Sequence, residues 1–214
     1  MTQLSANKTT PLWTGIGMIW LFHVSGLIGI ALGYQQWFIE KTSLNLTVSL
    51  LIFALLYPLK EIKSVVVFFF IALIGMAAEW MGVHWGWFFG DYDYGDNFGP
   101  KFQGVPYLIG LYWALLTLAT AAMAQRWVTP PWLQWVIAAA LMVGLDMLLE
   151  QWAPVFDFWE FDPKPPVDNY LSWFVLGFLL QIFWNKWGSK GNYLVSLHLI
   201  AAQVFFFGLL FAFY

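Results

Sequence analysis

The sequence contains no cysteine, which excludes disulfides, cysteine-ligated metals and thiol nucleophiles. Charged residues are scarce as well, at 10% of the 214 residues, where an ordinary soluble protein has about 25%. The nine Lys and Arg and the twelve Asp and Glu give a net charge of −3, too small to indicate a polyanionic partner such as nucleic acid. These shortages exclude a disordered chain, a nucleic-acid-binding protein and a water-soluble single domain.

Hydrophobic residues account for 61% of the chain and occur in long continuous runs. A helix needs about 20 mostly apolar residues to cross a bilayer, and the runs lack the alternation of a membrane barrel. We therefore expect an all-α, polytopic membrane protein that folds as one domain over residues 1–214. About seven transmembrane helices are predicted, of which the second is short: residues 12–33, 44–59, 64–87, 105–124, 133–152, 170–187 and 193–214.

Positive charge is distributed unevenly between the two predicted sides of the membrane. Short cytoplasmic loops carry an excess of Lys and Arg. The N-terminus and the connections after the second, fourth and sixth predicted helices hold six of the nine such residues: Lys8, Lys60, Lys63, Arg126, Lys186 and Lys190. The opposite side holds Lys41, Lys101 and Lys164. We therefore expect an integral membrane protein with a cytoplasmic N-terminus.

Two of the predicted connections, residues 88–104 and 153–169, are long and rich in Gly, Pro, Asp and aromatic residues. Both lie on the predicted non-cytoplasmic side, and loops of this length without evident secondary structure are commonly functional. A proline and, seven residues later, a tryptophan follow in each case: Pro106 and Trp113, then Pro166 and Trp173. The constant offset of 60 positions indicates that the third and fourth helices are repeated as the fifth and sixth.

Acidic residues fall inside two of the predicted helices, where an ionised carboxylate is costly and therefore suggests function. Glu79 lies in the third helix, and Asp146 and Glu150 lie four residues apart on one face of the fifth. Glu79 and Asp146 are about 12 Å and about 9 Å below the outer helix ends, so they can meet at similar depth. With no Lys or Arg inside the spans other than Lys186 at the opposite end of the sixth, at least one acid should keep its proton and serve as a general acid. The structural alternative is that these acids only hydrogen-bond to their neighbours and lock the helices together.

Aromatic residues make up 21% of the chain and gather next to these acids. Their faces can stabilise a cation, although an interfacial aromatic belt explains the same pattern without function. The three histidines, His23, His84 and His198, show no His-x-x-x-His or Glu-x-x-His spacing. No metal site is therefore predicted.

Several short motifs follow one another between residues 75 and 175. They are, in order, Glu79, Gly90-Asp91-Tyr92-Asp93-Tyr94, Gly104-Val105-Pro106, Trp113, Asp146, Trp159 and Pro166-x-x-Asn169-x-x-x-Trp173. In this order they resemble the integral-membrane carotenoid 1′,2′-hydratases, the group that includes bisanhydrobacterioruberin hydratase. The chain departs from the family pattern at Glu150-Gln151, where an Asp-Pro pair is expected, and at Ser172, where a glycine is usual.

The resemblance implies a carotenoid biosynthesis enzyme, a hydro-lyase that adds water across the terminal double bond of an acyclic carotenoid end group to give a tertiary alcohol. It implies no cofactor, a lipophilic carotenoid as substrate in the lipid bilayer, and other carotenoid biosynthesis enzymes as further candidate partners. The expected proton donor is Asp146 or Glu79, with the other acid, Glu150 or Asn169 positioning water. The residues expected to surround the substrate are aromatic: Tyr92, Tyr94, Trp113, Trp159 and Trp173.

Two alternatives remain open. A membrane carotenoid end-group cyclase also begins by protonating the terminal alkene, but its product has the mass of its substrate. A proton-conducting seven-helix channel would use the same intramembrane acids. A retinal-binding protein is disfavoured, because the last predicted helix contains no lysine for a Schiff base.

Overall fold

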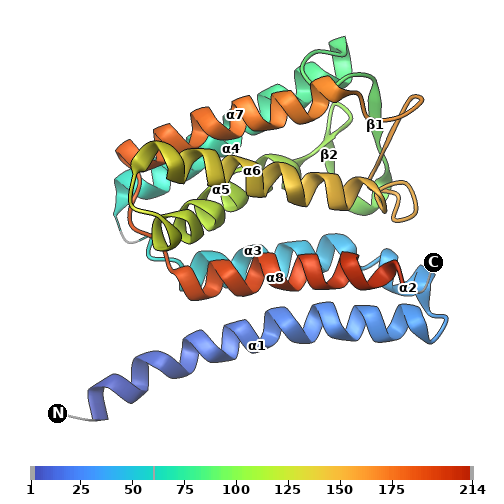
Figure 1. Cartoon of the computed structure of the whole chain (residues 1–214). Helices are drawn as coiled ribbons and strands as arrows, with labels where there is room; N and C mark the ends of the chain where they lie inside the picture. Colours follow the sequence, from blue (N-terminus) through green and yellow to red (C-terminus); the bar gives the residue numbers. More distant parts are fainter. Residues whose placement is uncertain (1–2, 60, 213–214) are drawn as a thin grey trace.

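The computed structural model describes residues 3–59 and 61–212, and helices dominate it (Figure 1). The helices are, in chain order, α1 (Gln3–Ala31), α2 (Gln35–Ile39), α3 (Thr42–Leu56), α4 (Ile62–Trp85), α5 (Tyr107–Trp127), α6 (Pro131–Glu150), α7 (Val167–Trp187) and α8 (Tyr193–Leu210). Within the described residues, six of them (α1 and α4 to α8) are long and apolar enough to cross a membrane. The prediction of an all-α, polytopic membrane protein is confirmed.

The second predicted helix is shorter than the other membrane-spanning candidates. It was expected over residues 44–59, but α3 ends at Leu56 because Tyr57 turns to an extended backbone conformation just before Pro58. Its 15 residues cover about 22 Å, less than the roughly 30 Å of a hydrocarbon core. The described chain therefore has six long apolar helices and one shorter one, in agreement with the prediction of about seven helices of which the second is short.

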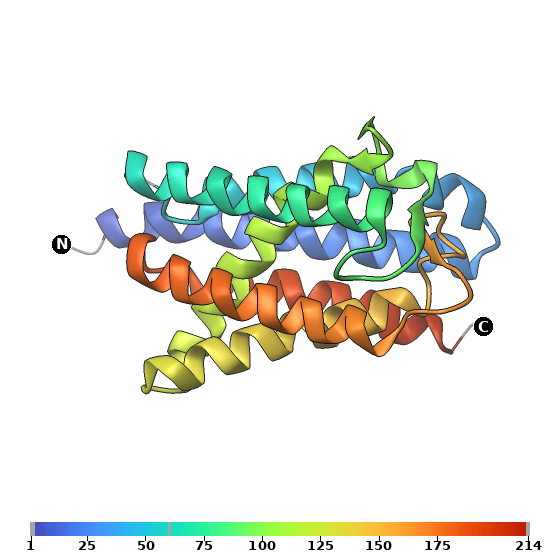
Figure 2. The same cartoon turned by 90° about the horizontal axis from the view of Figure 1, so that it is seen from above.

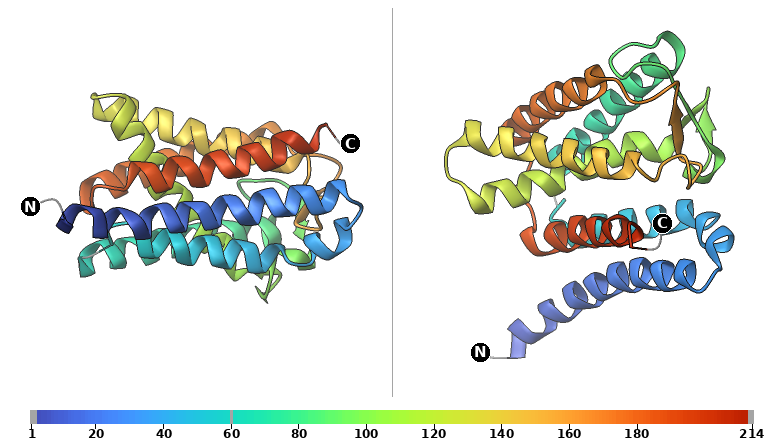
Figure 3. Two further views of the ribbon diagram at one scale, coloured as in Figure 1. Left: turned by 90° about the horizontal axis from the view of Figure 1, so that it is seen from below. Right: turned by 45° about the vertical axis from the view of Figure 1, so that its right-hand side comes forward.

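The long helices lie roughly side by side in three tiers (Figures 1 and 3). One tier is α1 alone, the next is α3 with α8, and the last contains α4 to α7. Among the six long helices, α5 is the most completely buried, and it runs obliquely across the bundle (Figure 2). It contacts α3, α4, α6, α7 and α8, so it forms the centre of the core.

Two glycines let α4 and α5 approach closely. A Cβ at Gly75 would lie 2.5 Å from the Trp113 side chain, and one at Gly110 would lie 2.8 Å from the Ala72 carbonyl oxygen. Neither distance is sterically possible, so both positions require glycine. The close approach brings the Trp113 ring against α4, which is the helix that carries Glu79.

The two long loops are not irregular, contrary to expectation. Strand β1 (Tyr92–Tyr94) from the first loop pairs antiparallel with β4 (Trp159–Phe161) from the second, and β2 (Lys101–Phe102) pairs with β3 (Val105–Pro106). A short 3-10 helix, η1 (Asp96–Phe98), lies between β1 and β2 in the chain. These strands were not predicted, because each has only two or three residues and lies among turn-forming residues. The paired loops form a single cap over one end of α4 to α7 (Figure 1).

Matching positions of the two halves lie next to each other in the cap and in the helices below it. Asp93 and Glu160 are paired at the centre of the ladder and stand 67 positions apart in the sequence, as do Glu79 and Asp146. Trp113 and Trp173, 60 positions apart, stack on each other with ring centroids 3.9 Å apart and planes 18° from parallel. The geometry supports the repeat expected from the proline and tryptophan spacing.

Candidate active site

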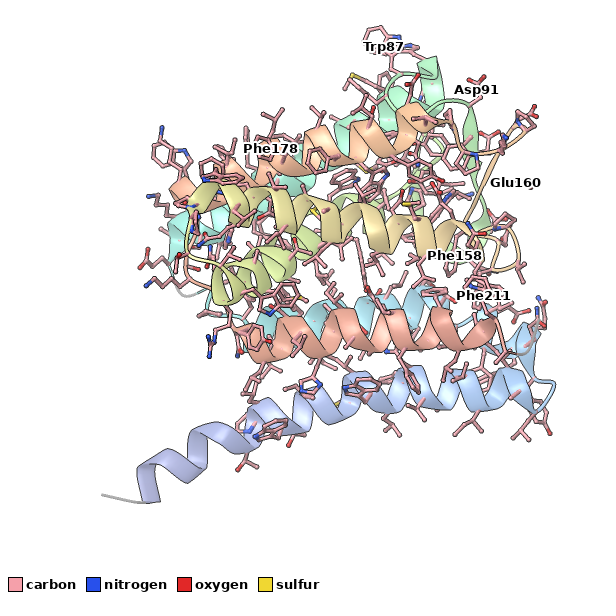
Figure 4. The ribbon with its side chains drawn as sticks, viewed as in Figure 1. Trp87, Asp91, Phe158, Glu160, Phe178 and Phe211 are labelled. Carbon is pink, nitrogen blue, oxygen red and sulfur yellow. The ribbon has the colours of Figure 1, made fainter. Side chains whose placement is uncertain are left out.

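Three carboxylic side chains are buried near the cap: Glu79 is 2% exposed, Asp146 7% and Glu150 8%. All three line one small cavity under β1 and β4. At this end of the molecule the loop acids Asp91 and Glu160, labelled in Figure 4, are exposed on the outer surface. The buried acids are therefore separated from the surface acids by the cap.

The cavity is small. Its volume, measured as the space open to the centre of a water-sized sphere, is about 20 Å³, enough for about one water molecule. Its wall is mostly aromatic, with polar groups contributed by the acids, two tyrosines and one asparagine. The wall residues are Glu79, Phe89, Tyr92, Tyr94, Ile109, Asp146, Glu150, Trp159, Phe161, Asn169 and Trp173.

Glu79 is surrounded by hydrogen-bond donors. The hydroxyls of Tyr92 and Tyr94 donate to its Oε2 at 2.6 and 2.7 Å, and the Trp113 indole Nε1 donates to its Oε1 at 2.8 Å. Gly82, one turn further along α4, leaves room for the Tyr92 hydroxyl, which a Cβ there would meet at 2.7 Å. Because three groups can donate to its two oxygens, this environment can stabilise the ionised form of Glu79.

The two tyrosines stay protonated to serve this role. Burial and the negative charge of Glu79 raise the pKa of Tyr92 and of Tyr94 well above the ordinary phenol value. Both lie in β1, in the cap, and their side chains reach down to the helix. Their hydroxyls are therefore donors throughout the physiological pH range.

Asp146 lies in a different environment. Its carboxyl is a close neighbour of that of Glu150, one turn away on α6, and both accept from Asn169. The Asn169 amide Nδ2 donates to Asp146 Oδ2 at 3.3 Å and to Glu150 Oε1 at 2.5 Å, and the Tyr170 hydroxyl donates to Glu150 Oε2 at 2.5 Å. Two neighbouring carboxyls in a buried site cannot both ionise cheaply, so this pair is suited to hold a proton. Glu150 accepts from Asn169 and Tyr170, whereas Asp146 accepts from Asn169 alone.

The structure brings most of the predicted site residues to one place. Tyr92, Tyr94, Trp159, Asn169 and Trp173 all line the cavity together with the three acids. Trp113 is the exception, because it is fully buried behind Trp173 and Glu79 and is absent from the cavity wall. Its contact with Glu79 makes it a support for the acid.

Four residues of the site were not singled out by sequence reasoning. Phe89, Ile109 and Phe161 line the cavity, and Tyr170 donates to Glu150. Phe89 and Phe161 belong to aromatic clusters in which no spacing distinguishes them from their neighbours. The only available signal for Tyr170 was its position beside Asn169.

The histidines lie outside the cavity wall. A ring nitrogen of His23 hydrogen-bonds with the Ile19 carbonyl, and His198 accepts from the indole of Trp20. In the part of the chain that the structure describes, no three His, Cys, Asp or Glu side chains are placed to hold a metal ion.

A family model described as "Carotenoid biosynthesis protein" matches residues 41–213, which include the whole site and every helix from α3 to α8. Comparison with curated proteins and with solved structures found no match.

Proposed function

The chain belongs to the carotenoid biosynthesis protein family, and on that premise we propose that it is a carotenoid hydratase. The reaction is acid-catalysed addition of water to the terminal carbon–carbon double bond of an acyclic carotenoid, giving a tertiary alcohol. The observation that carries the proposal is the buried pair of Asp146 and Glu150, joined by Asn169, at a cavity with room for one water molecule. An alkene has no basic atom, so a desolvated carboxylic acid at the double bond is what its protonation requires.

Asp146 is the proton donor in this proposal. Its O–H bond breaks as the proton adds to the less substituted alkene carbon, and the positive charge forms on the tertiary carbon. The faces of Trp159 and Trp173 line the cavity and each stabilise a cation by about 0.5–2 kcal/mol. The carboxylate of Glu79 adds negative charge on the opposite side.

Water completes the reaction. The water oxygen attacks the tertiary cation and its proton passes to the acid pair, which restores the starting state. Glu150 and Asn169 are placed to hold this water, because both line the cavity and contact Asp146. Atoms and charges balance: one water is consumed, no electrons are transferred, and no redox partner is required.

A carotenoid end-group cyclase shares the protonation step and then closes a ring by losing a proton. The polar face formed by Glu150 and Asn169 favours hydration, since a cyclase protects its cation from water. A proton channel needs a continuous polar path, and the described wall around the acids is mainly aromatic. These observations support the hydratase over both alternatives.

The test is expression in a host that accumulates an acyclic carotenoid, followed by mass analysis of the pigments. A gain of one or two water masses is expected, and in ¹⁸O-labelled water the new hydroxyl carries the label even without dioxygen. An unchanged mass with a cyclic product would identify a cyclase. Label taken from ¹⁸O₂ would overturn acid-catalysed hydration.

We also propose that the N-terminus lies in the cytoplasm and the cap on the opposite side. The N-terminal end of α1 and the cap are at opposite ends of the bundle (Figure 1), and basic residues are concentrated at the N-terminal end. Because the chain has no cysteine, Lys164→Cys and Lys190→Cys each provide a unique thiol. A membrane-impermeant thiol reagent applied to intact cells should label only the first of these variants.

A further inference from the structure

The acid cavity is too small for its proposed substrate. Space for one water molecule cannot accept a branched five-carbon end group. The substrate must therefore approach through an adjoining space, and a wall residue must move to admit it.

An adjoining space exists between α4 and α7. It is an apolar groove of about 500 Å³ that opens on the side of the bundle, and its floor and rims include Ala77, Ala78, Met81, Val175 and Leu176. Among the described residues that line it, Ser172 alone is polar, and its hydroxyl donates to the Phe88 carbonyl at 2.6 Å. The groove therefore offers a hydrocarbon surface with its one hydroxyl already bonded.

Phe89 separates the groove from the cavity. It lines both spaces, is 2% exposed, and its ring lies among those of Tyr92, Trp113 and Trp173 at centroid distances of 6.2–6.5 Å. Its backbone neighbours Phe88 and Gly90 have φ of 69° and 92°, so the ring is presented from a tight turn. Rotation of this one side chain would join the two spaces.

The two equivalent helix pairs of the repeat are packed differently in the described residues. The repeat relates the α4–α7 pair to the α6–α5 pair, but α5 and α6 pack directly against each other and α8 covers α5. On the α4–α7 side, Leu171, Val175 and Leu179 remain 59%, 48% and 55% exposed along one face of α7. They extend over about 12 Å of helix, a path that faces the bilayer laterally.

We propose that the groove between α4 and α7 binds the chain of a linear polyene, which enters sideways from the bilayer and directs its terminal double bond past Phe89 to Asp146. This deepens the proposed function and rests on it. The occupant is argued from the continuity of an apolar groove with an acid cavity in a carotenoid biosynthesis family. A phospholipid acyl chain in the groove is the alternative occupant that the test addresses.

The test fills the groove with an indole. Val175→Trp places the indole in the groove. The control, Val204→Trp, places it on the surface of α8. The two valines are matched in exposure, at 48% for Val175 and 45% for Val204. Both variants and the wild-type chain are expressed in a host that makes lycopene. Bound pigment per mole of purified protein is measured by absorbance, and product by mass. Val175→Phe and Val175→Ala provide a graded series should the tryptophan variant fail to accumulate.

We expect Val175→Trp to retain about tenfold less lycopene than Val204→Trp and to form correspondingly less product, with Val175→Phe intermediate and Val175→Ala close to wild type. Equal retention and equal product in the two tryptophan variants would overturn the groove while leaving hydration intact. Loss of bound pigment in Val175→Trp alone, with no water gained by any variant, would support the groove and overturn the hydratase. If Val175→Trp loses bound phospholipid while its bound lycopene is unchanged, the groove is an acyl-chain site, and the proposal is overturned.

Discussion

Glu79 and Asp146 occupy equivalent positions in the two halves of the repeat but have different neighbours. Around Glu79, β1 supplies Tyr92 and Tyr94, two donors. In the other half the equivalent positions of β4 are Trp159 and Phe161, which donate nothing to Asp146.

Polar groups of the second half come from other positions. Glu150 and Asn169 surround Asp146, and their counterparts beside Glu79 are Val83 and Ile109. One half therefore surrounds its acid with three donors, and the other places its acid beside a second carboxyl group. The comparison teaches that position in the fold placed both acids, whereas their neighbours divided the roles.

The largest expected effect is that of Asp146→Asn on activity. The amide keeps the shape and the contact with Asn169 but has no acidic proton, so product formation should fall by about 10²–10⁴-fold. Pigment mass analysis measures the loss, and accumulation of the protein with an unchanged thermal midpoint is the control. Hydration near the wild-type level would remove Asp146 from the mechanism and with it the contrast between the halves.

Glu79→Gln should affect stability more than Asp146→Asn does. The amide NH₂ would face at least one of the three donors that now point at Glu79, leaving a buried group unpaired at a cost of about 1–3 kcal/mol. A thermal-shift measurement in detergent should show the lower midpoint, and residual product should exceed that of Asp146→Asn. A stable Glu79→Gln variant with no activity would instead identify Glu79 as the proton donor.

Removing the hydroxyls of Tyr92 and Tyr94 tests the surroundings of Glu79 through the pH dependence of thermal stability. Because the pKa of Tyr92 and of Tyr94 is raised in the folded protein, their contribution to stability is complete below about pH 10, the unfolded value. It declines as pH rises above that. The wild type should lose thermal stability above about pH 10 more steeply than Tyr92→Phe/Tyr94→Phe, which is less stable at neutral pH. Parallel alkaline curves for the two proteins would contradict this.

The smallest effects are expected at the surface of the cap. Asp91 is exposed, and Asp96 is exposed and bonded to Lys101 at 2.9 Å, an arrangement that contributes little to stability in water. Asp91→Asn and Asp96→Asn should each keep activity within about twofold of wild type and leave the thermal midpoint nearly unchanged. A loss comparable to that of Glu79→Gln in either variant would place chemistry in the cap.

Sequence reasoning anticipated much of this site. It placed Glu79 and Asp146 at matching depth from their distances to the helix ends, and the structure puts both in one cavity. The proline and tryptophan spacing indicated the repeat that stacks Trp113 on Trp173. It did not anticipate that β1 and β4 pair, because strands of three residues in turn-rich loops carry no periodic signal.

The sequence by itself determined the class of molecule and the identity of the buried acids. Apolar run length and the absence of charge are local properties, and lipid as solvent leaves a chain of this composition little choice but helices. The tertiary structure alone decided which groups surround each acid, that Trp113 stands behind the site, that Phe89 lines both the cavity and the groove, and that the groove lies between α4 and α7. These features depend on which faces of helices meet across 60 or more residues of chain, and no local pattern encodes that.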